Sequence, residues 1–350
     1  MRRHAAACLL ALGLSGVLAC DTNGDAAARR RTRGTNGATL AAVRARGAVN
    51  CGISQATGFA VPDDAGRWRG FDVDFCRAIA AALWNDPEKV VFTPYTQQQR
   101  FAGLQSGEVD LLVNGTTETS SRALRMGLRF GPVYLYDGQG FLVSNALHAA
   151  SAKALNGATV CVQPGTTTEL TLSDFARRNG ITLRPVVIED LRTLVSAVAT
   201  RRCDVITQDG AGLATTRTML RDPSHFTILP ERISKEPIAS VMRAGDDQWR
   251  DVVSWVFYAT MQAEELGITQ ANVAERARDA DPGVRRFLGE EPGVTDGLGL
   301  DPRWAAHVIA KVGNYGEIYD RNLGPSALAL PRGLNVPWTQ GGLLYSPPFR

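Results

Sequence analysis

The sequence predicts an α/β protein of two lobes. Residues 49–113 alternate strand, helix, strand, helix and strand patterns, and residues 159–207 repeat that order. Such alternation favours mostly parallel sheets with helices packed on them. Of the 350 residues 44% are hydrophobic and 21% are charged, which is enough apolar material for two medium-sized cores. Two α/β units in tandem therefore predict two lobes whose strand ends face a cleft, where open α/β sheets bind ligands.

The elements of the first unit follow from apolar spacing. Phe75, Ile79 and Leu83 recur at i, i+4 and i+8, and they predict a helix over 72–84. Before it, Thr39 is expected to cap a short helix that leads into a strand. The strands of this unit are expected at 48–51, 90–92 and 110–113, and its other helices at 39–46 and 98–106.

The second unit shows the same alternation, and a less regular region follows it. Strands are expected at 159–162, 183–188 and 204–207, with helices ending at 179 and spanning 191–200. Beyond residue 240, two amphipathic helices are expected at 248–266 and 301–311, and the tail is rich in Gly and Pro. This region carries no catalytic signature.

The N-terminus is typical of a secretory signal peptide, expected at 1–20. A positive start with Arg2 and Arg3 precedes an apolar stretch over 5–18, which is short for a membrane span. The stretch runs into Val17-Leu18-Ala19-Cys20, which resembles a lipobox and makes Cys20 the candidate for lipidation. Ordinary cleavage near 26–28, with Cys20 discarded, is the alternative. Both interpretations predict export.

Residues 21–38 are expected to form a flexible tether, because they offer almost no large apolar side chain to bury. The formal net charge of the chain is +3, but six arginines against two aspartates place +4 within residues 1–38. The rest of the chain therefore carries −1. A nearly neutral body gives no sign of a nucleic-acid-binding surface.

Four cysteines remain after Cys8 and Cys20 are set aside, and an even number in an exported protein favours disulfides. Three pairings are possible. The positions of the cysteines favour two bridges, one in each lobe, and four buried thiols are the alternative. The expected bridges are Cys51–Cys76 and Cys161–Cys203.

A glycine, several hydroxyls and an arginine follow the strand at 110–113. Gly115, Thr117 and Arg122 lie in this segment, where a short helix begins. Backbone N–H groups at a helix start favour negative charge, and a guanidinium binds a carboxylate through two parallel hydrogen bonds. The segment therefore predicts an anion site. Alternatively, Arg122 is one of several surface arginines and Thr117 only caps the helix.

Two polar segments end strands of the second unit. The hydroxyl-rich turn at 165–169 can offer N–H groups to an anion, although Thr166 and Glu169 could serve only as a helix cap. Asp209 follows the strand at 204–207 and suits an ammonium group, unless it caps the helix from residue 211. Because buried charges need counter-charges, this set of groups fits a small zwitterion.

The sequence predicts no catalytic residues, no metal site and no cofactor. No Ser-His-Asp arrangement and no metal-ligand cluster is evident. The turn at 165–169 lacks the lysine and the spacing of a phosphate-binding P-loop.

An ordered series of motifs runs from about residue 39 to residue 350. It resembles the polar amino-acid substrate-binding proteins of ABC transporters, and most closely their general L-amino-acid-binding branch. The motifs are Gly70-Phe71-Asp72-Val73-Asp74, Leu104-Gln105-Ser106-Gly107-Glu108-Val109-Asp110, Tyr136-Asp137-Gly138-Gln139-Gly140-Phe141, Gly165-Thr166-Thr167-Thr168-Glu169, Ile233-Ser234-Lys235-Glu236-Pro237 and Val312-Gly313-Asn314-Tyr315-Gly316-Glu317.

The resemblance implies the two-lobe, type II periplasmic-binding-protein fold, which closes on its ligand like a flytrap. Two crossing strands, near 140–143 and 238–241, would join the lobes. Lobe 1 would then comprise residues 39–141 and 239–350, and lobe 2 residues 142–238.

The resemblance also implies residue roles. Arg122 would bind the α-carboxylate of an amino acid, helped by Thr117 and Thr167. Asp209 would bind the α-ammonium group, to which Gly115 would offer its carbonyl.

The site departs from many relatives, which hold the ligand side chain between two aromatic rings. Phe59 could supply one ring, but Gln97 stands where the second is often found. This departure mildly favours a broad pocket.

The implied function is capture of L-amino acids outside the cytoplasm and delivery to the permease and ATPase subunits of an ABC importer. The protein would be periplasmic, and anchored to the membrane if Cys20 is lipidated. No enzymatic activity is expected. Two alternatives remain: a dehydratase-type enzyme, for which Glu169 is the only candidate general acid, and a ligand-sensing module.

Overall fold

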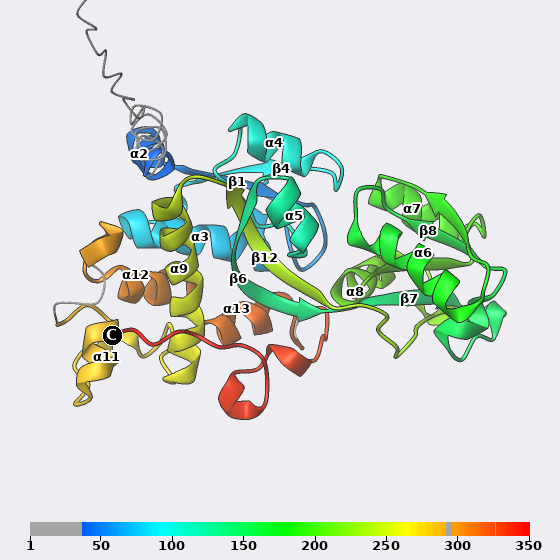
Figure 1. Cartoon of the computed structure of the whole chain (residues 1–350). Helices are drawn as coiled ribbons and strands as arrows, with labels where there is room; N and C mark the ends of the chain where they lie inside the picture. The colour runs from blue at the N-terminus through cyan, green and yellow to red at the C-terminus, as the bar shows by residue number, and fades with distance from the viewer. Residues whose placement is uncertain (1–36, 292–295, 326) are drawn as a thin grey trace, which may run out of the picture.

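The computed structural model describes residues 37–291, 296–325 and 327–350. Two α/β lobes, each built on its own five-stranded sheet, confirm the predicted fold class (Figure 1). The expected signal peptide with Cys20, and nearly all of the expected tether, lie outside these residues. Among the helices within them, none is both long and apolar enough to cross a membrane.

The first sheet has the strand order β4-β1-β5-β12-β6. Three of its strands run parallel, as the alternation predicts, and β12 runs antiparallel to β5 and β6. The strands are β1 (Val49–Ile53), β4 (Val90–Pro94), β5 (Leu111–Leu112), β6 (Leu128–Asp137) and β12 (Glu236–Arg243). The C-terminal ends of β1, β4 and β5 therefore lie at one edge of the sheet.

The second sheet has the order β11-β7-β10-β8-β9, with β8, β9 and β10 parallel. Its strands are β7 (Gln139–Ser144), β8 (Thr159–Val162), β9 (Arg184–Val187), β10 (Val205–Asp209) and β11 (Phe226–Ile228). The helices of this lobe are α6 (Thr167–Asn179), α7 (Leu191–Ala199) and α8 (Gly210–Met219).

Helix α3 (Phe71–Trp84) is the centre of the first lobe and is buried on nearly every side. Its apolar spacing predicts one buried face against the sheet. The C-terminal helices cover its other faces, and Phe75 stacks on Phe257 of one of them at a ring distance of 4.5 Å. The C-terminal region thus completes the core of the first lobe rather than forming a third unit (Figure 1).

The remaining elements include the C-terminal helices that pack on α3 and several shorter segments. The other helices are α2 (Ala38–Arg46), α4 (Arg100–Ser106), α5 (Ser120–Arg125), α9 (Asp247–Glu265), α10 (Val273–Arg276), α11 (Pro282–Phe287), α12 (Trp304–Val312) and α13 (Tyr315–Asn322). A small ribbon pairs β2 (Val61–Pro62) with β3 (Trp68–Arg69). Short 3-10 helices span Asn145–Leu147, Ala152–Leu155, Pro223–His225, Asp296–Leu298, Gly333–Asn335 and Trp338–Gln340.

The expected cap of α2 by Thr39 is wrong. Gly37 occupies the N-cap position, and the carboxylate of Asp246 accepts hydrogen bonds from the backbone N–H groups of Gly37 and Thr39 at 2.8 and 2.7 Å. The same carboxylate caps α9 through the N–H of Trp249. Unpaired N–H groups at a helix start donate to any carboxylate within reach, and here the carboxylate comes from far along the chain.

Both expected disulfides are present, one in each lobe. Cys51–Cys76 ties β1 to α3. Cys161–Cys203 ties β8 to the segment before β10.

The chain passes between the two sheets twice. Gly138 separates β6 from β7, and residues 229–235 separate β11 from β12. The two connections run side by side, because Asp137 at the end of β6 pairs with Glu236 at the start of β12. The lobe boundaries expected after residues 141 and 238 fall inside β7 and β12.

Candidate functional site

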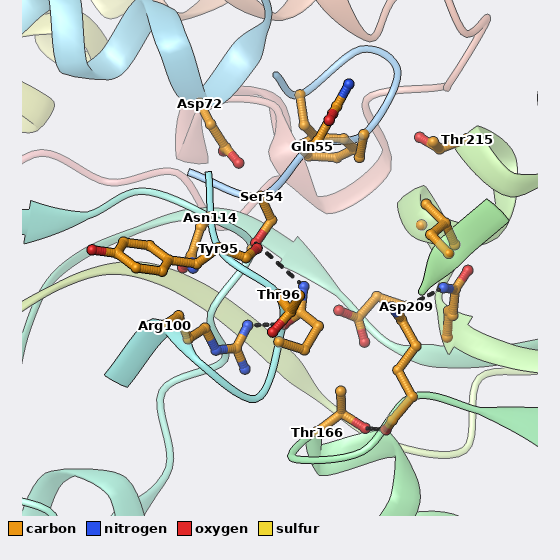
Figure 2. Close-up of a pocket in the computed structure, with 18 of the residues that line it drawn as sticks. Ser54, Gln55, Asp72, Tyr95, Thr96, Arg100, Asn114, Thr166, Asp209 and Thr215 are labelled. Atoms are coloured by element: carbon orange, nitrogen blue, oxygen red, sulfur yellow. Dashed lines mark hydrogen bonds between the residues drawn. The ribbon is translucent and has the colours of Figure 1, made fainter. Parts of the chain in front are cut away.

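A cavity of about 420 Å³ lies between the lobes (Figure 2). Loops that follow β1, β4 and β5 line it from the first lobe, and loops that follow β8, β9 and β10 line it from the second. The lobes touch beside it, where Thr215 donates a hydrogen bond to the carbonyl of Thr57 at 2.8 Å. Seven residues expected to contact ligand line this cavity: Arg122, Asp209, Thr117, Thr167, Gly115, Phe59 and Gln97.

Asp209 stands at the end of β10 with its carboxylate unused by the described residues. It occupies the N-cap position of α8 but makes no capping hydrogen bond to the described backbone. Asp137 caps this helix instead, accepting from the N–H groups of Gly210 and Ala211 at 3.1 and 2.7 Å. The Oδ1 atom of Asp209 is shielded from solvent and has no partner in the described ranges. Burial, together with the negative charges of Asp137 and Glu236, raises the pKa of Asp209 well above its usual value.

Arg122 is a buried cation, not a surface arginine, with only 6% of its area exposed. Thr119, rather than Thr117, caps α5 through the N–H of Arg122. The guanidinium donates to the carbonyl of Thr117 at 2.7 Å and lies 5.3 Å from the centre of the Phe101 ring. Burial lowers the pKa of Arg122, and nearby acids oppose that effect. Within the described part of the chain it forms no ion pair.

Glu236 is a site residue that the sequence reasoning missed. It is 2% exposed, and its Oε2 atom accepts hydrogen bonds from the hydroxyls of Thr117 and Thr167 at 2.6 and 2.8 Å. Ser234 donates to its other oxygen at 2.5 Å. A hydroxyl has only one proton. In this geometry both threonine hydroxyls therefore offer lone pairs to a ligand, and Glu236 links the two lobes through them.

Gly115 belongs to a chain of hydrogen bonds that begins in the cavity wall. Its N–H donates to the Tyr134 hydroxyl at 3.4 Å, and that hydroxyl donates to the buried carboxylate of Asp72 at 2.9 Å. The φ of Gly115 is +67°, in the left-handed region that favours glycine. Burial raises the pKa of Asp72 to about 7.

The cavity wall expected to hold the ligand side chain is mixed in character. Phe59 is almost buried and packs edge-on against Phe71 at 6.2 Å. Gln97 accepts a hydrogen bond from Arg100, which also lines the cavity. Sequence reasoning missed Arg100 because nothing in its helical pattern separates it from an ordinary surface arginine.

The turn at 165–169 both caps a helix and lines the cavity, the two roles that the sequence left open. Thr166 does cap α6, accepting from the N–H of Glu169 at 3.3 Å, and Glu169 accepts from the N–H of Gly165. Thr167 and Thr168 nevertheless line the cavity at the start of this helix. Among the described residues, no three side chains of metal-ligating type gather at one point.

Residues 49–271 match the family of bacterial extracellular solute-binding proteins, family 3. The chain belongs to this family. The general L-amino acid-binding periplasmic protein AapJ of Rhizobium johnstonii is 51% identical to this solute-binding protein over 316 residues, which cover 89% of this chain and 93% of AapJ. The glutamate/glutamine/aspartate/asparagine-binding protein BztA of Rhodobacter capsulatus is 49% identical over 315 residues, which cover 89% and 93%. The resemblance drawn from the motifs is thus confirmed.

A solved structure shares the architecture of most of this solute-binding protein. It is the ABC transporter periplasmic binding protein of Brucella ovis with glutathione bound, which superimposes with a TM-score of 0.87 at 46% sequence identity. The match covers 89% of this chain and 99% of that one.

Proposed function

We propose that this solute-binding protein captures L-amino acids in the periplasm and delivers them to an ABC importer. One observation carries the proposal. A carboxylate on Asp209, whose buried Oδ1 atom has no partner among the described residues, lines the cavity from one lobe. A buried guanidinium on Arg122, which forms no ion pair within the same ranges, lines it from the other. Each of these two charged groups is costly to keep in the site until an opposite charge pairs with it. An amino acid supplies both opposite charges, one on its carboxylate and one on its ammonium group.

The named relatives support the class of ligand and of partner. AapJ and BztA are named for amino acids, and the Brucella ovis protein, named for an ABC transporter, holds a peptide with an amino-acid end. The periplasmic assignment rests on AapJ and the Brucella ovis protein, which are both named as periplasmic. The two lobes, which the chain connects at Gly138 and through residues 229–235, are proposed to close on the ligand about these side-by-side connections. Closure would exclude water and strengthen both charge pairs.

The position of Glu169 favours binding over a dehydratase reaction. This candidate acid accepts a hydrogen bond from the N–H of Gly165, and it is not among the described residues that line the cavity. A turnover assay with dehydratable acids tests the enzymatic alternative. A ligand-sensing module would bind the same ligands, but cells that produce it together with an amino-acid ABC importer would show no added uptake of amino acids.

Calorimetry on protein freed of bound ligand, titrated with each of the twenty L-amino acids, tests the proposal. We expect at least one dissociation constant near the micromolar range, which corresponds to about −8 kcal/mol. Arg122→Ala is the matched variant that should lose this binding. Absence of heat with every amino acid would contradict the proposal.

Anchoring through Cys20 is a separate proposal, supported by the lipobox-like Val17-Leu18-Ala19-Cys20. The full chain expressed in a bacterium should fractionate with membranes, and Cys20→Ser should release it. An unchanged soluble fraction for both proteins would contradict anchoring.

A further inference from the structure

Exposed arginines gather at the edge of the second sheet that lies opposite the cavity. Loops that follow the parallel strands β8, β9 and β10 line the cavity, so the residues that precede these strands lie at the other edge. The N–H of Arg184 donates to the carbonyl of Ala158 at 2.9 Å. The N–H of Asp204 donates to the carbonyl of Thr159 at the same distance, so these preceding segments are neighbours. The exposed arginines in and beside them form what we call the basic edge: Arg177, Arg178, Arg184, Arg201 and Arg202.

Most of the positive charge of the basic edge is unbalanced. Arg177 pairs with Asp174 at 2.6 Å, and it alone of the five forms an ion pair within the described residues. The Nη2 atom of Arg184 donates to a neutral backbone carbonyl. Asp204 stands among the arginines, but its carboxylate accepts from the N–H and the hydroxyl of Thr159. The remaining guanidinium groups can therefore bind an anion that comes from outside the protein.

Helix ends alone do not explain this surplus of charge. Cations are favourable near the C-terminus of a helix, and α6 and α7 end at this edge. In lobe 1, however, α3 and α4 carry no basic residue in their last turns. From the last turn of each helix to the first residue of the next strand, α2, α3 and α4 bring three cations and four acids, whereas α6 and α7 bring five arginines and one aspartate. The basic edge therefore distinguishes lobe 2 from lobe 1.

The chemistry of the basic edge fits a surface of phosphate groups better than it fits another protein. Protein interfaces depend on a few large aromatic or aliphatic side chains. None of the large apolar side chains that are exposed in the described residues belongs to the segments of the basic edge, 176–184 and 196–204. Guanidinium groups bind phosphate through paired hydrogen bonds, and clustered basic residues are attracted to anionic lipid. The expected tether brings charge of the same sign through Arg29, Arg30, Arg31 and Arg33.

We propose that the basic edge of lobe 2 docks on the anionic phospholipid headgroups of a membrane surface. In this orientation the cavity faces away from the lipid, because it lies at the other end of β8, β9 and β10. Lobe 1 makes no part of the contact and stays free to move. The inference depends neither on the ligand of the cavity nor on lipidation of Cys20, so it can fail while the proposed function holds.

Co-sedimentation with vesicles tests this docking. The exported full chain carries Cys20→Ser, so that no acyl chain contributes to binding, and this parent protein keeps its tether. Vesicles with about one third phosphatidylglycerol in phosphatidylcholine are compared with vesicles of phosphatidylcholine alone. We expect at least tenfold stronger partition onto the anionic vesicles in about 50 mM salt, and loss of most of that difference in about 300 mM salt, because salt screens exposed charges.

A triple variant isolates the basic edge from the tether. Arg184→Gln, Arg201→Gln and Arg202→Gln together remove three charges and leave the tether unchanged. This variant should lower partition onto the anionic vesicles at least tenfold. Its thermal unfolding and its amino-acid binding should stay close to those of the parent protein, since none of the three side chains lines the cavity.

The matched control removes the same charge from lobe 1. Arg67→Gln, Arg69→Gln and Arg278→Gln together replace three exposed arginines, and partition should stay within twofold of the parent protein. If the triple variant of the basic edge does not fold, Arg177→Gln with Arg178→Gln decides. These two side chains lie on the exposed last turn of α6, and their loss should lower partition about fivefold.

Three results would overturn the inference. Equal partition of the parent protein onto anionic and neutral vesicles would exclude attraction to anionic lipid. Equal losses in the basic-edge variant and the lobe 1 control would assign the attraction to net charge rather than to one surface. Unchanged partition of the basic-edge variant would assign it to the tether.

Discussion

Replacing Asp209 by asparagine removes one charge from the site and keeps its shape. In the free protein the carboxylate has a buried Oδ1 atom without a described partner, and neighbouring Asp137 and Glu236 add repulsion. Asp209→Asn keeps a polar group of the same shape but removes the buried charge and its repulsion, so it should stabilise the unliganded protein, by about 1–3 kcal/mol. A residue that capped α8 would show the opposite sign, because losing a cap destabilises a helix.

The same change should weaken amino-acid binding. The ligand ammonium group would lose its buried counter-charge, at a cost of about 2–4 kcal/mol. That cost corresponds to roughly 30- to 1,000-fold in the dissociation constant. Stability and affinity would then move in opposite directions, which a merely misfolded variant cannot reproduce.

Two measurements check these expectations. Calorimetry of wild type and Asp209→Asn, each against an amino acid and its deaminated counterpart, gives a coupling term for the ammonium group. Thermal unfolding without ligand gives the effect on stability. Asp137→Ala is the matched control, since it removes the oxygens that accept from the N–H groups of Gly210 and Ala211 and should lower stability. A coupling term near zero would refute the assignment, as would destabilisation of the unliganded protein by Asp209→Asn.

Three other predictions concern single groups. Arg122→Ala should weaken amino-acid binding by about 2–5 kcal/mol, because the ligand carboxylate would be buried and unpaired. Arg122→Lys should restore only part of the lost affinity. A near wild-type affinity of the alanine variant, measured by calorimetry, would contradict this prediction. Replacing Cys161 and Cys203 by serine opens a link of 42 residues and should lower the free energy of unfolding by about 4 kcal/mol on the chain-entropy treatment; unchanged denaturant midpoints would count against it. The pKa of Asp72 is about 7 in the folded protein against a usual 3.8, so the folded state holds this proton more tightly than the unfolded state does. The free energy of unfolding of the wild type should therefore fall by up to about 4 kcal/mol as pH rises from about 4 to 7, and Asp72→Asn should lack this fall. Parallel curves of stability against pH for the two proteins would refute the prediction.

Local pattern was enough for much of the fold. The strands around Val49, Val90, Thr159 and Val205 follow from short apolar runs that end in polar turns, and both disulfides follow from where the cysteines stand among them. The later strands β6 and β12 show no such clean signal. Their pairing joins residues about a hundred positions apart, and no local pattern records it.

Sequence pattern is sufficient to predict two α/β lobes, with glycine, hydroxyl, arginine and aspartate residues at the strand ends that face a cleft. Which of these groups remain free for a ligand depends on contacts between segments that are far apart in the chain. Asp209 is available because Asp137 caps its helix, and the hydroxyl protons of Thr117 and Thr167 go to Glu236. A buried polar group takes whichever partner the fold brings within about 3 Å, and distance along the chain does not limit that choice.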